Sequence, residues 1–504
     1  MASITFAAID VGSHELSMKI YEMSKQRGIR ELTYIRHKIS LGTETYTKGF
    51  ISYQSVDEIC KILNDFKRSI KEYGAEVIQA YATSALREAS NSLVVIDQIK
   101  IQTGFHVCTL SNSEARFLYF KAVALREQSF EDLIEEGTLV IDIGAGSVQL
   151  SFFENGKLQL TQNLLLGSSR IRELLEAMRE ETYDFQGLID EYIERDLVYF
   201  QKLNLHSTSV EHIIAVGEMI PEIYYYIQKD HSDFDGTLPS KWLNRNKFPK
   251  DLIGTQATLF LPTLILCQKI SDLTNCEDIL LSNINLCDVI AAEYAEKKMR
   301  ITSTHNFTED ILSASLSIAN KYHVDREHVE NVQALALQIF DRIRKLHGLG
   351  KRERLLLQLG VILHSCGSYI NEIQSRECSY RIIMSTEIIG ISHIERAMIA
   401  NMVRYNEASF PRFEDLEEDF TRDEYITIVK LNAILKTANV LDKSNRQKKK
   451  KVGVTLQDGI LTITADTMAD ITLEKGLFYH KADVFEEVFG IRPQLRQKRS
   501  GKRG

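Results

Sequence analysis

The chain has 504 residues, of which 44% are hydrophobic, 26% are charged and only 6 are proline. This composition is typical of a globular protein with several domains, and it excludes a mainly disordered or fibrous chain. The formal net charge of −8 means that a polyanion is expected to bind only through a local basic region, not through the overall field.

The sequence also predicts a cytoplasmic chain. The longest apolar run, residues 259–267, is interrupted by Pro262, so no membrane span is expected. The N-terminus has no basic segment and carries Asp10 in its first apolar stretch, unlike a signal peptide. Seven cysteines without a Cys-x-x-Cys pair predict free thiols in a reducing compartment and no metal site made from sulfur ligands.

The first 125 residues alternate between strand and helix patterns. We expect strands at 4–9, 16–21, 32–41, 77–82 and 105–110, and helices at 55–73 and from Asn112. The first of these helices is predicted from apolar residues at helical spacing. Three strands followed by alternating helices and strands predict an α/β lobe.

A partial repeat of this order predicts a second α/β lobe. Strands are expected at 138–141, 148–153, 158–166 and 213–216, with Asn155-Gly156 as the turn of a hairpin. Helices complete this lobe to about residue 298.

The pattern changes after about residue 305. Helices are expected at 308–320, 325–346, 351–364, 380–389, 393–405 and 423–442, and a hairpin at 452–464 turns on Asp458-Gly459. Two basic segments flank this hairpin, Arg446–Lys451 and a tail at Arg492–Arg503. The predicted domains are two α/β lobes, 1–124 and 125–300, and a mostly helical domain, 301–504.

Two strand-turn-strand units occupy equivalent places in the two lobes, at Ala8–Ser13 and Val140–Ser147. Each first strand ends in an aspartate, Asp10 or Asp142, and the chain then turns on glycine. Such a turn directs backbone N–H groups at one point where an anion can bind, and the aspartate can hold a cation that neutralises the same anion. The duplication therefore predicts a phosphate site between the lobes.

The sequence resembles the exopolyphosphatase/guanosine pentaphosphate phosphohydrolase (Ppx/GppA) family. The resemblance is carried by Phe6–Ser13, Ala82–Ala89, Ser113–Arg116 and Leu139–Ser147, in the order and spacing of that family. It implies two RNase H-like lobes of the actin and sugar-kinase superfold. It extends over the helical third, which is similar to the HD-type domain of long family members.

The resemblance also implies roles for individual residues. Glu114 matches the general base that activates water. The alternative interpretation is that Glu114 has only a structural role, as an acid that interacts favourably with the dipole at the start of a helix. Asp142 matches a metal-associated aspartate, with Asp10 at the corresponding place in the first lobe and Gln149 at a further metal position. Mg²⁺ or Mn²⁺ is the implied cofactor. The implied phosphate-binding residues are Gly12, Ser13, Arg87, Gly144, Gly146 and Ser147.

Several positions depart from the family pattern. His14 stands where the family has asparagine, and Gln149 replaces an acid, so metal affinity is expected to be weaker and Gln149→Glu to tighten it. Glu218 lies in a loop that normally reads Gly-x-Gly-Gly-Thr, where it is expected to repel a phosphate chain. Arg87 is expected to clamp phosphate, with pairing to Glu88 as its alternative.

The helical domain lacks most of the HD metal pattern. An active HD phosphohydrolase needs histidines and aspartates that bind metal, whereas this chain has His328, His364-Ser365 and Asn439. We therefore expect no independent metal site there, and we interpret His364 as a core histidine.

Together these features predict a metal-dependent hydrolase that releases terminal phosphate from inorganic polyphosphate, or from pppGpp, with water activated by Glu114. The alternative is a weakly active or non-catalytic relative that binds polyphosphate or a guanosine polyphosphate as a sensor. The basic segments suit a polyanion partner, although charge runs are commonly solvated surface. The sequence contains no recognised nucleic-acid-binding module, and we expect no membrane partner. The sequence is compatible with a homodimer.

Overall fold

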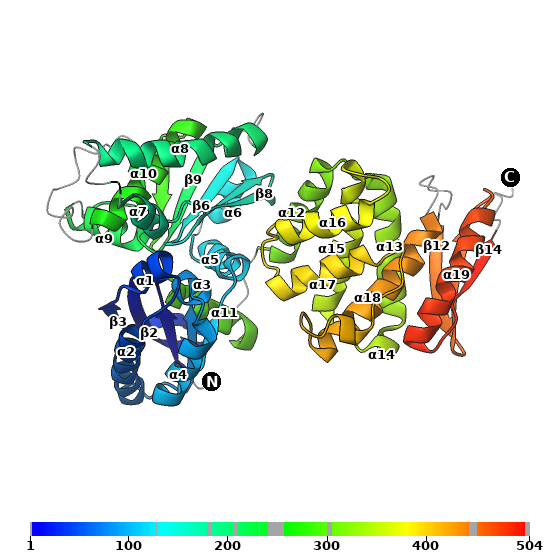
Figure 1. Ribbon diagram of the computed structural model, residues 1–504, viewed down its shortest axis with the longest axis horizontal. Coiled ribbons are helices and arrows are strands. Elements are labelled where there is room, and N and C mark those ends of the chain that lie inside the picture. Colours follow the sequence, from blue (N-terminus) through cyan, green and yellow to red (C-terminus); the bar gives the residue numbers. More distant parts are fainter. Residues whose placement is uncertain are drawn as a thin grey trace. The chain divides into compact units, whose positions relative to one another are not determined.

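The computed structural model describes residues 3–127, 129–176, 178, 183–204, 209–230, 232–239, 257–299, 305–442 and 451–498. The chain divides into two compact units, Met1–Ile311 and Leu312–Gly504. In Figure 1 the first unit contains two α/β lobes and the second is mostly helical. This architecture confirms the predicted fold class, and the predicted boundary between the two lobes stays a prediction.

The first sheet has the strand order β3-β2-β1-β4-β5. Its strands are β1 (Ile4–Val11), β2 (Glu15–Ser24), β3 (Gly28–Lys38), β4 (Val77–Ala82) and β5 (Val107–Thr109). β1 pairs antiparallel with β2 and parallel with β4, so the carboxyl ends of β1 and β4 meet at one edge of the sheet. The third strand predicted from sequence is wrong at its end, because buried Leu41 begins a helix. An apolar residue at that position fits the core in either conformation.

The second sheet repeats this arrangement in the order β10-β11-β9-β6-β7-β8. Its strands are β6 (Thr138–Ile143), β7 (Val148–Glu154), β8 (Lys157–Leu164), β9 (His212–Gly217), β10 (Thr237–Pro239) and β11 (Asp278–Leu281). β6 pairs antiparallel with β7 and parallel with β9, as β1 does with β2 and β4. The predicted hairpin turn is confirmed, since Asn155 and Gly156 both have positive φ.

Helices bury the faces of both sheets. In the first lobe, α2 and α4 pack over residues such as Ile9 and Leu16, and α11 packs on β1 and β2. In the second lobe, residues of α7, α8, α9 and α10 join one continuous core with β6, β7 and β9. The helices of this unit are α1 (Leu41–Lys48), α2 (Tyr53–Glu72), α3 (Ser84–Glu88), α4 (Ser92–Thr103), α5 (Asn112–Arg126), α6 (Phe130–Glu135), α7 (Ser168–Glu176), α8 (Phe185–Asn204), α9 (Ile220–Asp230), α10 (Ala257–Thr274), α11 (Leu286–Tyr294) and the π-helical turn η2 (Ala295–Met299).

The second unit consists of helices and one small sheet of order β12-β13-β14. Its helices include α12 (Phe307–Lys321), which begins in the first unit, α13 (Arg326–Arg342), α14 (Arg344–His347), α15 (Lys351–Leu363), α16 (Ser375–Ser385), α17 (His393–Arg404), α18 (Arg422–Asn439) and α19 (Thr472–Phe489), with short turns η3 (Cys366–Tyr369), η4 (Phe413–Asp415) and η5 (Val440–Asp442). The strands are β12 (Lys451–Gln457), β13 (Ile460–Asp466) and β14 (Gln494–Lys498). The predicted helices and hairpin are confirmed in type, and α19 and β14 were missed.

The predicted basic tail is wrong over residues 492–498. β14 pairs parallel with β13, and Arg492 forms ion pairs with Asp483 at 2.7 Å and Glu486 at 3.1 Å. Leu495 in this strand is only 5% exposed. In the sequence, the basic residues around Leu495 make the segment resemble a solvated tail. The rest of the tail and the lysines of the other basic segment up to Lys450 lie outside the described residues.

We expect a chain that ends at Ile491 to unfold at a lower temperature than a chain that ends at Lys498. The shorter chain loses β14 and uncovers the apolar surface that Leu495 buries, which is worth roughly 1.5–3 kcal/mol for one such side chain. Thermal unfolding followed by circular dichroism measures the difference. Equal unfolding temperatures for both truncated chains would show that β14 contributes no stability.

None of the helices in the described part of the chain combines the length and the apolar character that a membrane span requires.

Candidate functional site

A small pocket of about 70 Å³ lies where the two lobes meet. The turns after β1 and β6 form it together with the segments that follow β4 and β9 and the start of α5. Its lining residues are Asp10, Gly12, Thr83, Ser84, Arg87, Ala115, Arg116, Tyr119, Asp142, Gly144, Ala145, Gly146, Ser147, Gly217 and Glu218. The two duplicated turns predicted from sequence are therefore brought together in space.

Glycine is required at two points of this pocket by close backbone approach. A Cβ at Gly12 would lie 2.8 Å from the carbonyl oxygen of Glu15, whose acceptance of the Gly12 N–H at 2.9 Å closes the turn. Gly217 has φ of +124°, and a Cβ there would lie 2.2 Å from the Ile143 carbonyl oxygen. Glycine alone adopts this conformation readily, so the end of β9 can pass closely beside β6.

Direct contacts join the lobes around the pocket. A Cβ at Gly146 would lie 3.2 Å from Glu88 Oε1 and 3.4 Å from the Ser84 side chain, so this turn lies against α3 of the first lobe. Arg170 donates to Glu88 Oε2 at 2.7 Å and to the Gly146 carbonyl at 2.8 Å. These contacts hold the second turn against the segment that carries Arg87.

His14, which departs from the family pattern, also joins the lobes. Its Nε2 is hydrogen-bonded to the hydroxyl of Ser169. Burial and then the positive charge of Arg172 lower the pKa of His14 to about 4, so the ring is neutral near pH 7. The substitution therefore supplies a neutral polar contact beside the pocket without adding a charge.

Two carboxylates, each with one buried oxygen, face the first turn. Asp10 Oδ1 and Glu218 Oε1 have no hydrogen-bond partner among the described residues, and they lie 3.7 Å and 3.5 Å from the position of a Cβ at Gly12. Burial, then Glu218 and Glu15, raise the pKa of Asp10 well above its usual value. Burial, then Glu15, raise the pKa of Glu218 to about 8, although the His14 N–H lowers it in part. Burial therefore favours the protonated, neutral form of both carboxyl groups when no cation is present.

Arg116 occupies the opposite side of the pocket. Its guanidinium is buried and donates to Ser147 Oγ at 2.6 Å and to Gln149 Oε1 at 2.9 Å, and its Nε lies 3.9 Å from Asp142 Oδ2. Burial raises the pKa of Asp142 and Arg116 lowers it in part. Gln149 does not line the pocket, because its amide is held by Arg116 and by Ser151.

Glu114 is the N3 residue of α5 and closes a capping box. Its Oε2 accepts from the Ser111 N–H at 3.0 Å and from the Ser111 hydroxyl at 2.6 Å, while its own N–H donates to that hydroxyl at 3.2 Å. This is the role that the alternative interpretation predicts. The next two residues along the helix, Ala115 and Arg116, line the pocket, but Glu114 does not.

Most of the residues predicted from sequence gather at the pocket. Arg87 lines it, donates to the Leu110 carbonyl at 2.7 Å and lies 3.8 Å from Glu88, so both interpretations of Arg87 describe part of its surroundings. Ser13 lies beside the pocket, with its hydroxyl 3.3 Å from that of Ser84. Asp10, Gly12, Asp142, Gly144, Gly146 and Ser147 line it, whereas Glu114 and Gln149 do not.

Sequence analysis missed the part that Arg116 and Tyr119 play in this pocket. Arg116 belongs to the Glu-Ala-Arg segment that carried the resemblance, and that position was the available signal. The pKa of Tyr119 is raised well above its usual value, first by burial and then by Asp10 and Asp142. Nothing in the local sequence marks this tyrosine, because its proximity to both aspartates depends on how α5 crosses between the sheets.

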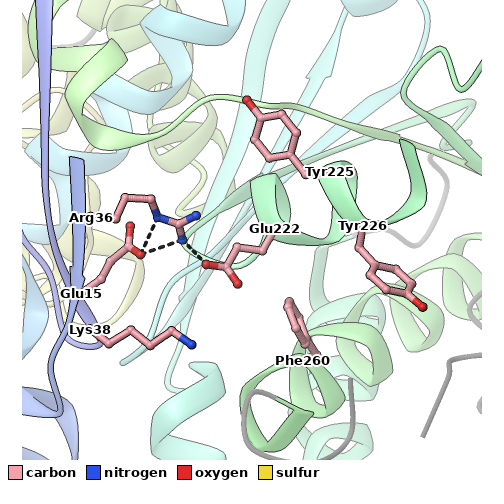
Figure 2. A pocket seen from close by; sticks show the side chains of 7 residues that line it. All are labelled: Glu15, Arg36, Lys38, Glu222, Tyr225, Tyr226 and Phe260. Atoms are coloured by element: carbon pink, nitrogen blue, oxygen red, sulfur yellow. Dashed lines mark hydrogen bonds and ion pairs between the residues drawn. The ribbon is translucent and has the colours of Figure 1, made fainter. Parts of the chain in front are cut away.

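A second, more open cavity of about 480 Å³ lies beyond Glu15 (Figure 2). Arg36 is its central cation, and it donates to Glu15 Oε2 at 2.9 Å and 2.7 Å and pairs with Glu222. The remaining lining residues are Lys38, Tyr225, Tyr226 and Phe260. Because two carboxylates neutralise Arg36, this cavity offers aromatic surface with little net positive charge.

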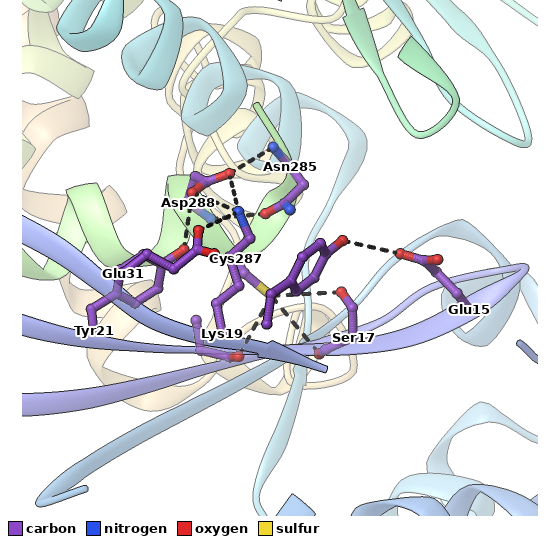
Figure 3. Close-up of polar contacts among 10 residues, drawn as sticks. Glu15, Ser17, Lys19, Tyr21, Glu31, Asn285, Cys287 and Asp288 are labelled. Carbon is purple, nitrogen blue, oxygen red and sulfur yellow. Dashed lines mark hydrogen bonds and ion pairs between the residues drawn. The ribbon is translucent and has the colours of Figure 1, made fainter. Parts of the chain in front are cut away.

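A polar network braces the sheet that carries Asp10 (Figure 3). Asp288 at the start of α11 accepts from Lys19 at 3.0 Å and from Tyr21 at 3.0 Å, and it caps its own helix through the Asn285 N–H at 3.0 Å. Burial alone would lower the pKa of Lys19, but Asp288 and Glu31 raise it. The network ties α11 to β2 and so supports the hairpin that ends in the first turn.

The helical domain brings together the remnant of the HD pattern. His328 Nδ1 lies 2.9 Å from Asp442 Oδ2, and His328 Nε2 lies 3.2 Å from His364 Nε2. His364 Nδ1 lies 2.7 Å from the Val361 carbonyl oxygen. Among the residues that the structure describes, no three histidine, cysteine or acidic groups are placed to hold a metal ion.

Two lobes that each open with a strand-turn-strand unit, and that enclose a pocket between those units, define a two-lobed, actin-like α/β protein. The sequence matches the Ppx/GppA phosphatase family over residues 20–247 and domain III of the Ppx/GppA phosphatases over residues 313–480. The chain belongs to the Ppx/GppA phosphatase family.

The curated relatives are distant. The chain is 20% identical over 424 residues, 79% of its length and 80% of the relative's, to a guanosine-5'-triphosphate,3'-diphosphate pyrophosphatase of Photobacterium profundum. It is 24% identical over 163 residues to exopolyphosphatase 1 of Mycobacterium tuberculosis, covering 32% of this chain and 46% of that protein. The chain thus spans less than half the length of several curated relatives that it matches. The structure of an Aquifex aeolicus family member is 20% identical, with a TM-score of 0.47, and covers 59% of this chain and 99% of that one.

Proposed function

We propose that this chain is a metal-dependent phosphoanhydride hydrolase that releases terminal phosphate from inorganic polyphosphate, and from pppGpp as a second substrate. The observation that carries the proposal is the interlobe pocket, which gathers both Asp-x-Gly turns and Arg87. The relatives named as an exopolyphosphatase and as a guanosine polyphosphate pyrophosphatase support this choice of substrates.

The pocket residues fit a divalent cation, because the buried oxygens of Asp10 and Glu218 have no partner in the described chain. A bound Mg²⁺ or Mn²⁺ would supply positive charge to the phosphoryl oxygens. The N–H groups of Gly12 and Gly144 donate to the carbonyl oxygens of Glu15 and Ser147 and close the two turns. The backbone N–H groups of Gly146 and Ser147 would orient the phosphoryl oxygens, and Arg87 would meet them with its guanidinium.

In this proposal Glu114 takes a proton from the attacking water. The Glu114 carboxylate accepts two hydrogen bonds from Ser111 in the structure. The side chain must therefore turn from the helix cap toward the pocket before it can act as a base. Glu114 is the one acidic residue of α5, and it directly precedes Ala115 and Arg116, which line the pocket.

Phosphate release from long-chain polyphosphate and from pppGpp, measured with Mg²⁺, with Mn²⁺ and with a chelator, tests the proposal. We expect release with either metal and none with the chelator. Binding of polyphosphate without any release would contradict hydrolysis and support a sensor, the class favoured by the neutral side chain of Gln149 and by the cap contact of Glu114. A chain that neither binds nor cleaves either compound would exclude both functions.

A further inference from the structure

The two sides of the interlobe pocket differ in charge. On the side of the second turn, the Arg116 guanidinium contacts Ser147 and Gln149 and lies 3.9 Å from Asp142. This fixed positive charge repels a second cation at short range. Gln149 adds a neutral amide whose oxygen is already occupied by Arg116. At the position that the family resemblance assigns to the metal, Asp142 is therefore the one carboxylate on offer, because Gln149 stands in place of the second.

The side of the first turn has the opposite character. Asp10 Oδ1 and Glu218 Oε1 are buried, lack hydrogen-bond partners in the described chain and flank the same glycine, Gly12. Two such carboxylates are costly to bury unless protons or a cation neutralise them.

The two oxygens reach this place from different lobes. Asp10 lies near the end of β1, and Glu218 directly follows Gly217 at the end of β9. Gly217, with its positive φ and its contact with the Ile143 backbone, fixes where the chain leaves β9. A cation between these carboxylates would therefore also link the lobes.

We propose that Asp10 and Glu218 together hold the divalent cation of this pocket, so that Glu218 supplies the carboxylate that Gln149 cannot. Mg²⁺ commonly takes one or two protein carboxylates and fills its other positions with water and substrate phosphate oxygens. Two carboxylates are thus enough, even though no cluster of three ligands exists among the described residues. Glu218, which the sequence suggested would repel phosphate, then attracts it through the metal.

The inference uses the pocket of the proposed hydrolase, but its test needs no substrate. Mn²⁺ is titrated into the metal-free full-length chain, and the electron paramagnetic resonance signal of free Mn²⁺ reports how much is bound. Glu218→Gln and Asp10→Asn preserve side-chain shape and remove one charge each. Glu222→Gln is the matched control, because it removes the same charge in the first turn of α9, close to Glu218 in the chain, but Glu222 contacts Arg36 and does not line this pocket.

We expect Glu218→Gln and Asp10→Asn each to weaken Mn²⁺ binding by about tenfold or more, since loss of even an indirect metal contact commonly costs this much. Glu222→Gln should leave the affinity within about threefold, and Gln149→Glu should not tighten it, because the new carboxylate would pair with Arg116. Unchanged binding in Glu218→Gln, or tighter binding in Gln149→Glu, would overturn the assignment and place the cation beside Asp142. Phosphate release decides the hydrolase proposal separately, so either idea can fail alone.

Discussion

Replacing Glu114 with glutamine is expected to lower phosphate release by about a hundredfold or more while leaving polyphosphate binding largely intact. Glutamine cannot accept the proton of the attacking water, and general bases commonly contribute 10²- to 10⁴-fold, so about a hundredfold is the lower end. Glutamine can still serve at N3 of a capping box, so the helix start should survive. Initial rates with long-chain polyphosphate, together with a binding isotherm, measure the two effects.

Ser111→Ala separates the chemical role of Glu114 from its structural role. This variant removes the hydroxyl that accepts the Glu114 N–H and donates to its carboxylate, at a cost of about 1 kcal/mol of stability, yet it keeps the acid. We expect Ser111→Ala to retain most of the activity. If Ser111→Ala loses as much activity as Glu114→Gln, the cap and not the base is what matters. If Glu114→Gln keeps near-normal turnover, Glu114 is not the base.

Replacing Arg116 with methionine is expected to destabilise the first unit by about 3–5 kcal/mol. The change removes a buried cation. It leaves the Asp142 carboxylate without the guanidinium that lies 3.9 Å from it. It also leaves Ser147 and Gln149 without their strongest donor. Urea unfolding, monitored with a probe located in the first unit, measures the loss of unfolding free energy. Polyphosphate binding should also weaken, because the second turn is no longer held.

Arg170→Met is the control for this experiment. Arg170 also joins the lobes, but its ion pair with Glu88 is partly exposed, with side chains 25% and 33% accessible. Such pairs are worth about 1 kcal/mol or less. A cost for Arg116→Met no greater than that for Arg170→Met would show that the buried network adds nothing beyond an ordinary surface contact.

The sequence was sufficient for most of the elements and for half of the pocket, but not for α19 and β14. Short apolar runs marked β1, β6 and β9, and the aspartate and glycine at the end of the first two marked the turns, because those features depend only on neighbours along the chain. The family resemblance then indicated that the turns face each other. The end of β3 and the strand β14 were misjudged, since Leu41 and Leu495 are apolar residues whose partners lie far away in sequence.

Only the tertiary structure decided the charges around the pocket. From its motif, Gln149 was predicted to be a weakened metal ligand, but Arg116 of α5, which is distant in the sequence, donates a hydrogen bond to its amide oxygen. Glu218 was expected to repel phosphate, but Gly217 and the parallel pairing of β9 with β6 bring it beside Asp10. There, Asp10 Oδ1 and Glu218 Oε1 have no hydrogen-bond partner in the described chain. A motif specifies which groups are present along the chain. Burial and distance, which fix their pKa values and their partners, arise only when the sheets and helices pack.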